Sequence, residues 1–338
     1  MATIRDVAKE AGVSIGTVSR AFNEYQDINA ETKTKVFEAA RRLGYVPNVN
    51  AKSLSSKSSN NMGVIVSGFM ESDRRVNFTM SMLKGTYRYA TKHQLEVALY
   101  TLDAEQQKQK SYEQFCTQHR LFGAVLSGVA TDEVYFHQLV EAGFPCVIID
   151  AYIKGAGLGC VSIDNVKATE ELVDYLVAAG HREIVIVEGK REAEVNNYRL
   201  AGIYAAFNKH QMELRKDRII TGEFRETIAY NKTKQYLEEH GKNGATAFLC
   251  FSDVMAFGVM RAITDMGYSV PNDFSVTGFD GIPISAYTTP TLTTIEQDME
   301  EMGYRAAELL QELAKNPENT KSVYVPYRFI ERSSVKKI

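Results

Sequence analysis

Long apolar runs and paired cysteines are both missing from this sequence of 338 residues. No stretch approaches the ~18 consecutive apolar residues that a transmembrane helix needs. The first residues are polar and charged, so they lack the apolar core of a secretory signal. The four cysteines have neither a pairing pattern nor the spacing of metal ligands, which fits a reducing compartment. We therefore expect a cytoplasmic protein that has no membrane partner.

Motifs for catalysis and for cofactor binding are also lacking. The six histidines have no metal-ligand spacing and no Ser or Cys partner pattern. Gly155-Ala156-Gly157-Leu158-Gly159 has the wrong spacing for a dinucleotide fingerprint, and no helix start follows it. Neither a phosphate-binding loop nor a nucleophile elbow occurs. The sequence therefore contains no argument for an enzyme, a metal or a cofactor.

The composition is that of an ordinary globular protein, with 44% hydrophobic and 24% charged residues. At roughly 150 residues per domain, the length predicts two or three domains. The charge is divided unevenly: residues 1–60 hold nine Lys and Arg against six Asp and Glu, and the rest holds 30 against 36. A basic N-terminal segment indicates a polyanion partner for that segment, although an ordinary solvated surface has the same balance.

Three short helices are predicted in this N-terminal head. Thr3-Ile4-Arg5-Asp6 matches a helix-capping pattern, so the first helix starts there and ends at Gly12, which accepts the left-handed conformation. Ser14 can cap a second helix that runs from Ile15 to about Asn23. The apolar spacing predicts a third helix from about Glu31 to Leu43.

The second predicted helix has an apolar face and a polar face. Val18, with Ala21 and Phe22, faces inward, because these residues recur at helical spacing. The opposite face carries Gly16, Ser19, Arg20 and Asn23. A helix, a tight glycine turn and such a second helix form a helix-turn-helix, whose second helix enters the major groove, where arginine can bond guanine. Periodicity alone also allows a three-helix cap on a larger enzyme.

Three segments of the head resemble the DNA-binding head of the lactose-repressor/galactose-repressor family: Thr3-Ile4-Arg5-Asp6-Val7-Ala8-Lys9-Glu10-Ala11-Gly12-Val13-Ser14, Thr17-Val18-Ser19-Arg20 and Leu43-Gly44-Tyr45-Val46-Pro47-Asn48. The resemblance implies that Ile15, Gly16 and Arg20 lie at the base-contacting positions. It implies phosphate contacts for Thr3, Ser14, Thr17, Ser19, Asn23, Tyr45 and Asn48. Because Gly16 has no side chain that could bond a base, Arg20 would carry more of the sequence discrimination.

A hinge is predicted after Asn48, followed by a Ser- and Asn-rich linker. A helix of about eight residues is not stable alone in water, where ~12–15 residues are needed. Ala51 and Leu54 continue the family resemblance, which implies that Leu54 is a wedge between base steps of the minor groove. Such a hinge would fold only when it is paired with its dimer mate on DNA. Contact of Leu54 with the neighbouring domain is the alternative.

From Met62 onward, short apolar runs alternate with helix-length segments. The expected strands are Gly63–Ser67, Glu96–Leu102, Gly123–Gly128, Pro145–Asp150, Cys160–Asp164, Glu183–Glu188, Thr246–Ser252 and Ser275–Asp280. Continuous apolar strands between helices predict an α/β body with doubly wound parallel sheets. Ligands of such folds bind beyond the carboxyl ends of the strands, where Asp150, Asp164, Asp253 and Asp280 are found.

The family resemblance continues through the body, for example at Ser162-Ile163-Asp164-Asn165, Arg199-Leu200-Ala201-Gly202 and Gly278-Phe279-Asp280. It implies a two-lobed, periplasmic-binding-protein-like (type I) effector domain, with crossings between the lobes near residues 163, 292 and 323. The expected fold class is thus a small all-α helix-turn-helix head plus a doubly wound α/β body. The expected domains are 1–47 (head), 48–61 (hinge and linker) and 62–338 (body, with lobes of about 62–163 with 293–323 and 164–292 with 324–338).

A carbohydrate effector presents hydroxyl groups and apolar ring faces. Arg199 and Asp280 match the two most dependable ligand positions of the family, and Asp150 ends an expected strand of the first lobe. The expected effector-binding residues are Asn77, Phe78, Asp150, Arg199, Ser252, Asp253 and Asp280. A salt bridge within one lobe is the alternative for Arg199, and a turn or cap role is the alternative for Asp280.

Three classes of function compete for this sequence. A periplasmic binding protein would need a signal peptide and no DNA-binding head, and an enzyme would need a catalytic constellation. We therefore interpret the chain as a sequence-specific DNA-binding regulator that acts at the nucleoid as a homodimer on near-palindromic operator DNA. Dimers rather than tetramers are expected, since the last residues leave no room for a coiled coil.

The expected role of this regulator is repression of carbohydrate-utilisation genes under the control of a sugar or sugar phosphate bound between the lobes. A global carbon-catabolite regulator that acts with a phosphoprotein corepressor is the alternative within the same class.

Overall fold

The computed structural model describes residues 2–22, 25, 28–45, 60–67, 75–139 and 143–338. The chain divides into two units, residues 1–59 and residues 60–338. The predicted hinge, with Ala51 and Leu54, lies outside the described residues. No helix in the described part of the chain is both long enough and apolar enough to cross a membrane.

The described residues of the N-terminal unit form three helices around a small apolar core. Their bounds are α1 Ile4–Ala11, α2 Ile15–Phe22 and α3 Ala30–Arg42. Thr3 and Asp6 form the expected capping box, and Gly12 ends α1 in the left-handed conformation at φ 67°. The Ser14 hydroxyl accepts a hydrogen bond from the Thr17 backbone N–H, which starts α2. The buried core side chains are Val7, Ala8, Val18, Ala21, Val36, Ala39 and Ala40.

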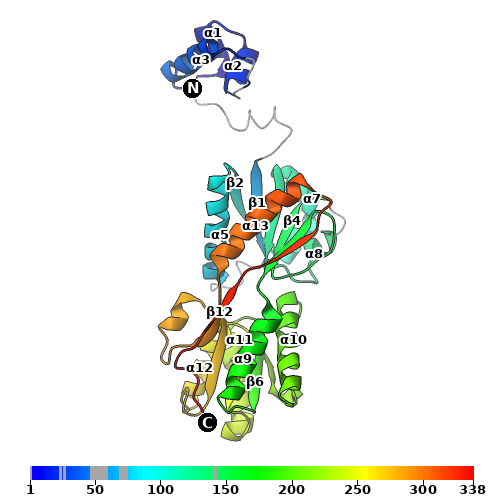
Figure 1. Cartoon of the computed structure of the whole chain (residues 1–338), viewed down its shortest axis with the longest axis vertical. Helices are drawn as coiled ribbons and strands as arrows, with labels where there is room; N and C mark the ends of the chain where they lie inside the picture. Colours follow the sequence, from blue (N-terminus) through cyan, green and yellow to red (C-terminus); the bar gives the residue numbers. More distant parts are fainter. Residues whose placement is uncertain (1, 23–24, 26–27, 46–59, 68–74, 140–142) are drawn as a thin grey trace. The chain divides into compact units, whose positions relative to one another are not determined.

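The C-terminal unit is built on two six-stranded sheets, one in each lobe (Figure 1). The first sheet has the strand order β11-β5-β4-β3-β1-β2, and all its pairs are parallel. Its strands are β1 Asn61–Ser67, β2 Glu96–Leu102, β3 Leu121–Ser127, β4 Cys146–Ile149, β5 Leu158–Ser162 and β11 Lys321–Tyr324. The helices of this lobe are α5 Arg75–Lys92, α6 Ala104–Gln109, α7 Tyr112–Gln118, α8 Val134–Gln138 and α13 Met299–Lys315.

The second sheet has the order β12-β10-β9-β8-β6-β7 and is parallel except for the antiparallel pair of β10 and β12. Its strands are β6 Ile184–Glu188, β7 Ile219–Thr221, β8 Ala247–Cys250, β9 Ser275–Asp280, β10 Thr293–Gln297 and β12 Tyr327–Ile330. The helices are α9 Asn165–Ala178, α10 Glu194–Lys209, α11 Glu226–His240 and α12 Asp253–Asp265, with short 3-10 turns at Lys216–Arg218, Gly241–Asn243 and Pro283–Ala286.

Helices cover the sheets in packed pairs. In the first lobe, α13 packs on α5 and on β3, β4 and β5, while α7 packs on β3. In the second lobe, α9 pairs with α10 and α11 pairs with α12 (Figure 1). The strands between them are almost wholly buried, as in β4, β6 and β8. The expected doubly wound α/β body is therefore confirmed.

The chain crosses between the lobes after β5, after β10 and after β11. The second crossing follows Gln297, whereas the resemblance implied a crossing near residue 292. The difference arises because β10 pairs with β9 in parallel on one edge and with β12 in antiparallel on the other, which makes Thr293–Gln297 a strand of the second sheet. The third crossing follows Tyr324, which pairs with Ser162 in the first sheet.

Candidate functional site

The exposed face of α2 is the candidate DNA-contacting surface of the N-terminal unit. Ile15, Gly16 and Arg20 are exposed, and Ile15 is 45% exposed although it is apolar. Val18 and Ala21 on the opposite face are fully buried. The packing of α2 against α1 and α3 therefore presents the three expected base-contacting positions to solvent.

The expected phosphate-contacting residues have more varied surroundings. The Thr3 hydroxyl bonds Asp6, and the hydroxyls of Ser14 and Thr17 lie 2.9 Å apart. Ser19 is half-buried. Tyr45 is also half-buried, with its ring centroid 5.9 Å from that of Phe22, so it belongs partly to the core. The remaining expected contacts, Asn23, Asn48, Ala51 and Leu54, lie outside the described residues.

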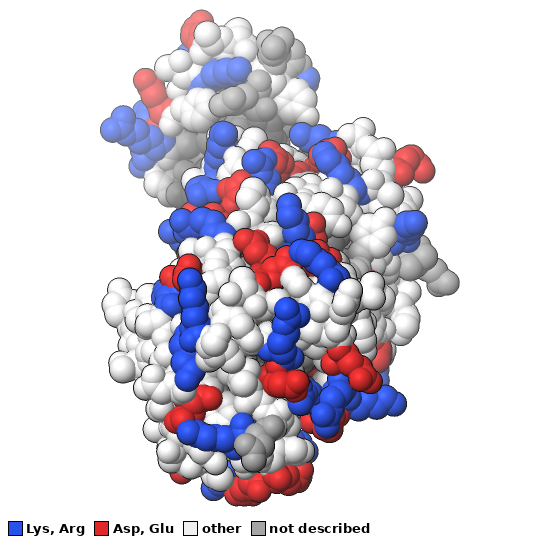
Figure 2. Space-filling view, turned by 60° about the horizontal axis from the view of Figure 1, so that its bottom comes forward, with Lys and Arg blue, Asp and Glu red and all other residues white. Residues whose placement is uncertain are grey.

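The surface of the body carries charges of both signs. On the face that Figure 2 displays, basic and acidic side chains are intermixed over the body. The described residues hold no cluster of His, Cys, Asp and Glu that could bind a metal ion. A cavity between the two lobes is the candidate ligand site of this unit.

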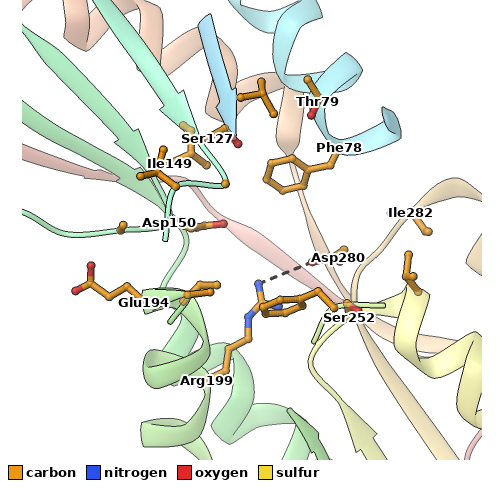
Figure 3. A pocket seen from close by; sticks show the side chains of 18 residues that line it. Phe78, Thr79, Ser127, Ile149, Asp150, Glu194, Arg199, Ser252, Asp280 and Ile282 are labelled. Carbon is orange, nitrogen blue, oxygen red and sulfur yellow. Dashed lines mark ion pairs between the residues drawn. The ribbon is translucent and has the colours of Figure 1, made fainter. Parts of the chain in front are cut away.

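Both lobes contribute to the wall of this cavity (Figure 3). The residues from the first lobe are Val66, Phe78, Thr79, Ser127, Gly128, Val129, Ile149, Asp150 and Ala151. Those from the second lobe are Ala193, Glu194, Val195, Arg199, Phe224, Ser252, Val254, Asp280 and Ile282. Most of these side chains are apolar, and the polar ones are few and converge, which is typical of a small-molecule site.

Arg199 of α10 is the cationic residue among the described residues that line the cavity. Its side chain is only 3% exposed, and its Nε donates a hydrogen bond of 2.9 Å to the Asn165 side-chain oxygen. Nη1 donates to the carbonyl oxygen of Phe251, and Nη2 lies 3.8 Å from the Asp280 carboxylate. The guanidinium also lies over the ring of Phe279, 3.7 Å from its centroid. These contacts fix the guanidinium in one orientation.

Asp280 and Asp150 face the cavity from opposite lobes, and both have a positive φ, 111° and 59° respectively. Non-glycine residues rarely adopt such a conformation, and they are found more often at functional sites than elsewhere. Burial raises the pKa of Asp280 to about 7, although Arg199 and the hydrogen bond from Gln297 oppose the shift. Burial also raises the pKa of Asp150, against the influence of Arg199.

A chain of hydrogen bonds joins the charged residues of the two lobes. The Ser162 hydroxyl, at the end of β5, donates to the Asp150 carboxylate over 2.6 Å. The Asn165 side chain, at the start of α9, donates to Ser162 over 3.0 Å and accepts from Arg199. Ser162 and Asn165 flank the first crossing between the lobes. These hydrogen bonds therefore couple the positions of the charged residues in the cavity to the position of the crossing.

Asp253 does not contribute to this cavity, contrary to the expectation from the sequence. It is fully buried within the second lobe, where its carboxylate accepts hydrogen bonds from the Thr294 hydroxyl and the Ile282 backbone N–H. Its position at the first turn of α12 turns it toward β9 and β10, while its neighbours Ser252 and Val254 line the cavity. Asn77 lies within α5, but its side chain is outside the described part of the structure.

The sequence did not indicate several cavity residues. Phe224 follows β7, a three-residue strand that was not predicted, and it too has a positive φ of 56°. Glu194 begins α10 and was not distinguished from other surface acids; its carboxylate accepts hydrogen bonds from the Tyr152 backbone N–H of the first lobe and from the Tyr198 hydroxyl. Ser127 is the last residue of β3. A polar residue at the carboxyl end of an expected strand was the sequence signal that could have identified it.

A helix-turn-helix head joined to a two-lobed body with a cavity between its lobes, where a few charged side chains converge, defines a class of protein, the ligand-responsive DNA-binding regulators. Residues 3–48 match the lacI family of bacterial regulatory proteins, and residues 173–335 match the periplasmic binding protein-like domain. With a relative at 30% identity over the whole chain, this protein belongs to the lacI family, and the resemblance inferred from the sequence is confirmed. It is therefore a DNA-binding transcriptional regulator.

Two curated relatives and one solved structure are similar over nearly the whole chain. The probable HTH-type transcriptional repressor ExuR of Bacillus subtilis is 30% identical over 340 residues, which cover 100% of this chain and 99% of that protein. Catabolite control protein A of Priestia megaterium is 31% identical, with 99% of each chain covered. The lac repressor dimer, solved with operator and the anti-inducer ONPF, is 26% identical, with 99% of each chain covered and a TM-score of 0.86.

Proposed function

We propose that this regulator represses carbohydrate-utilisation genes and that a sugar bound in the cavity between its lobes controls operator binding. The observation that carries the proposal is the cavity itself, where Arg199, Asp150 and Asp280 converge on a mostly apolar wall. Carboxylates and a fixed guanidinium exchange paired hydrogen bonds with neighbouring hydroxyls, and apolar side chains cover the ring faces of a sugar. Nothing in this arrangement calls for catalysis, so we propose binding without turnover.

The DNA contacts belong to the head in this proposal. Residues 1–47 bind DNA, residues 48–61 form the hinge, and residues 62–338 form the effector domain. Ile15, Gly16 and Arg20 contact bases, the remaining expected head residues hold phosphates, and Leu54 enters the minor groove. Two identical chains on one near-palindromic site satisfy the two-fold symmetry that such heads impose, so the active form is a homodimer at the nucleoid.

The proposal is tested by measuring operator binding with and without sugars. Selection from random DNA with the purified chain is expected to return a near-palindromic sequence with half-sites about one helical turn apart. A neutral mono- or disaccharide is then expected to change the affinity for that operator, and the Asp280→Asn variant is expected not to respond to it. The proposal is wrong if no carbohydrate changes operator affinity, or if Asp280→Asn responds as the unmodified protein does.

Global catabolite regulation is the second candidate function, because catabolite control protein A is among the similar proteins at 31% identity. A regulator of that kind would need a phosphoprotein partner for full operator affinity. Specific operator binding by the purified chain alone, at nanomolar concentration, would favour the single-pathway repressor. Binding only after a cell extract is added would favour the global regulator.

A further inference from the structure

The charges on the wall of the cavity are unbalanced. Among the described residues that line it, Asp150, Glu194 and Asp280 carry carboxylates, and Arg199 is the only cation. Figure 3 shows Asp150 on the side of the first lobe and Glu194 and Arg199 on α10 below it, with Asp280 paired to Arg199. Along the described part of the wall, a ligand therefore meets more carboxyl groups than cationic groups.

Arg199, the cation on the described part of the wall, is already partly engaged by the protein. Arg199 donates to the Asn165 side chain and to the Phe251 carbonyl, and it faces the Asp280 carboxylate at 3.8 Å. Its guanidinium also lies over the ring of Phe279. An acidic ligand that approached Arg199 would therefore compete with Asp280 for this charge.

The three carboxylates keep unused acceptor capacity. Each receives hydrogen bonds from the protein: Asp150 from Ser162, Asp280 from Gln297, and Glu194 from Tyr152 and Tyr198. A carboxylate offers about four lone-pair sites when ionised, and the Asp280 carboxyl, whose pKa burial raises to about 7, keeps acceptor capacity in its protonated form as well. Each of the three groups can therefore still accept from a ligand. Hydroxyl and ammonium groups can donate to these sites, whereas a phosphate or carboxylate group cannot and is repelled by them.

Glu194 is placed to act as the selective residue. Its Oε2 accepts a 3.0 Å bond from the Tyr152 backbone of the first lobe, and its Oε1 accepts a 2.6 Å bond from Tyr198 of its own helix. These two bonds hold the carboxylate at the junction of the lobes, on the opposite side of Arg199 from Asp280 (Figure 3). The described wall carries three carboxyl groups and one cation. Without Glu194, two carboxyl groups would remain beside that cation.

From these observations we propose that the effector is a carbohydrate without an acidic group, which donates hydrogen bonds to Asp150, Glu194 and Asp280, and that Glu194 sets the discrimination against phosphorylated and uronic sugars. This inference rests on the proposed function, and it narrows the effector from sugars and sugar phosphates to neutral and amino sugars.

The test compares sugars with derivatives that keep the same ring and carry a charged group. Glucose, galactose and mannose are matched with their 6-phosphates, uronic acids and 2-amino derivatives, and sucrose with its 6-phosphate. Binding to the full-length protein is measured by calorimetry, and melting temperature serves as a screen. The neutral or amino form is expected to bind at least about tenfold more tightly than its acidic partner, a difference of about 1.4 kcal/mol.

A matched pair of variants tests the role of Glu194. Glu194→Gln keeps the side-chain size and removes the charge, so the neutral-to-acidic affinity ratio is expected to fall at least threefold. Glu192→Gln makes the same change two residues away, at a side chain that does not line the cavity, and should leave the ratio unaltered. Equal ratios in the two variants would overturn the role assigned to Glu194.

The outcomes separate this inference from the proposed function. If a 6-phosphate or uronic acid binds as tightly as its neutral parent and alters operator affinity, the inference falls while the proposed function stands. If no member of either set binds, both fall. Tight binding of a neutral or amino sugar together with weak binding of its acidic partner supports both.

Discussion

The head and the body of this regulator present their candidate sites in opposite ways. The head uses one face of α2, eight residues long, and the three base-contacting positions on it are exposed. The cavity of the body is lined by residues from Val66 to Ile282, and of its charged residues Arg199 is buried while Asp150, Glu194 and Asp280 are half-buried. One site is local in sequence and solvated, while the other is distributed along the chain and largely desolvated.

This difference has energetic consequences. An exposed side chain on a helix can be replaced with little effect on folding, so its contribution is measured in binding alone. Removing a charge such as that of Arg199 or Asp280 from water costs free energy, which its partners in the protein offset. A change at the cavity therefore alters folding and binding together. The four predictions that follow test this contrast, from the largest expected effect to the smallest.

Gly85→Ala is expected to destabilise the body by about 3 kcal/mol. The two helices α5 and α13 approach so closely there that a Cβ at Gly85 would overlap the backbone carbonyl of Glu300. Urea unfolding of the full chain, followed by circular dichroism, measures the change in the free energy of unfolding. A loss below about 0.5 kcal/mol would mean that the helix pair can separate without cost.

Arg20→Ala is expected to weaken binding to the selected operator by about 1–3 kcal/mol and to relax base preference at one position of each half-site. The reason is that an exposed arginine on α2 can give guanine two hydrogen bonds. Fluorescence anisotropy with operator and scrambled duplexes measures both effects. Arg5→Ala, an exposed arginine of α1, is the control. Equal weakening on both duplexes would reduce Arg20 to a phosphate contact.

Asp280→Asn is expected to change how stability depends on pH. Burial raises the folded-state pKa of Asp280 to about 7 from an ordinary value near 3.8, so its protonated form is favoured by folding. Stability from this group is therefore fully present below pH 3.8 and is lost as pH rises from there to about 7, with about 1 kcal/mol of that loss above pH 6. Asp280→Asn removes that loss.

The measurement is urea unfolding of both proteins at pH 6 and pH 8. Asp273→Asn is the control, because the pKa of Asp273 is lowered to about 2 by its bonds to Lys242 and Ser269 and does not titrate in this window. It should keep the pH dependence of the unmodified protein. The same dependence in Asp280→Asn would mean that Asp280 is ionised throughout.

Gly16→Ala is expected to stabilise the head slightly, by about 0.5 kcal/mol, because alanine favours helix over glycine. A Cβ at this position would meet only the Ser14 hydroxyl, at 3.6 Å. Thermal unfolding of an isolated 1–47 fragment against the same fragment with the substitution measures the change. Gly16→Ala and Gly85→Ala add the same methyl group, which we expect to stabilise the head and to destabilise the body.

Much of the architecture was predictable from local patterns. The capping box of Thr3 and Asp6, the turn at Gly12 and the apolar spacing of α3 predicted the head nearly to the residue. The eight expected strands of the body are all present, with both ends exact in Glu96–Leu102 and Ser275–Asp280 and no end displaced by more than two residues in the others. The strands β7, β10, β11 and β12 were missed, because they are short or polar and become strands only by pairing with a sheet edge or with a crossing segment.

By itself the sequence determined the class of head and the doubly wound body, because caps, turns and apolar periodicity act over a few residues. The family resemblance also singled out Arg199 and Asp280, which line the cavity. Only the tertiary structure decided that Asp253 is turned into the second lobe while Ser252 faces the cavity, and that Glu194 and Phe224 join the wall. These outcomes depend on which strands pair and how the lobes meet. Such contacts link residues far apart in the chain, and no local pattern encodes them.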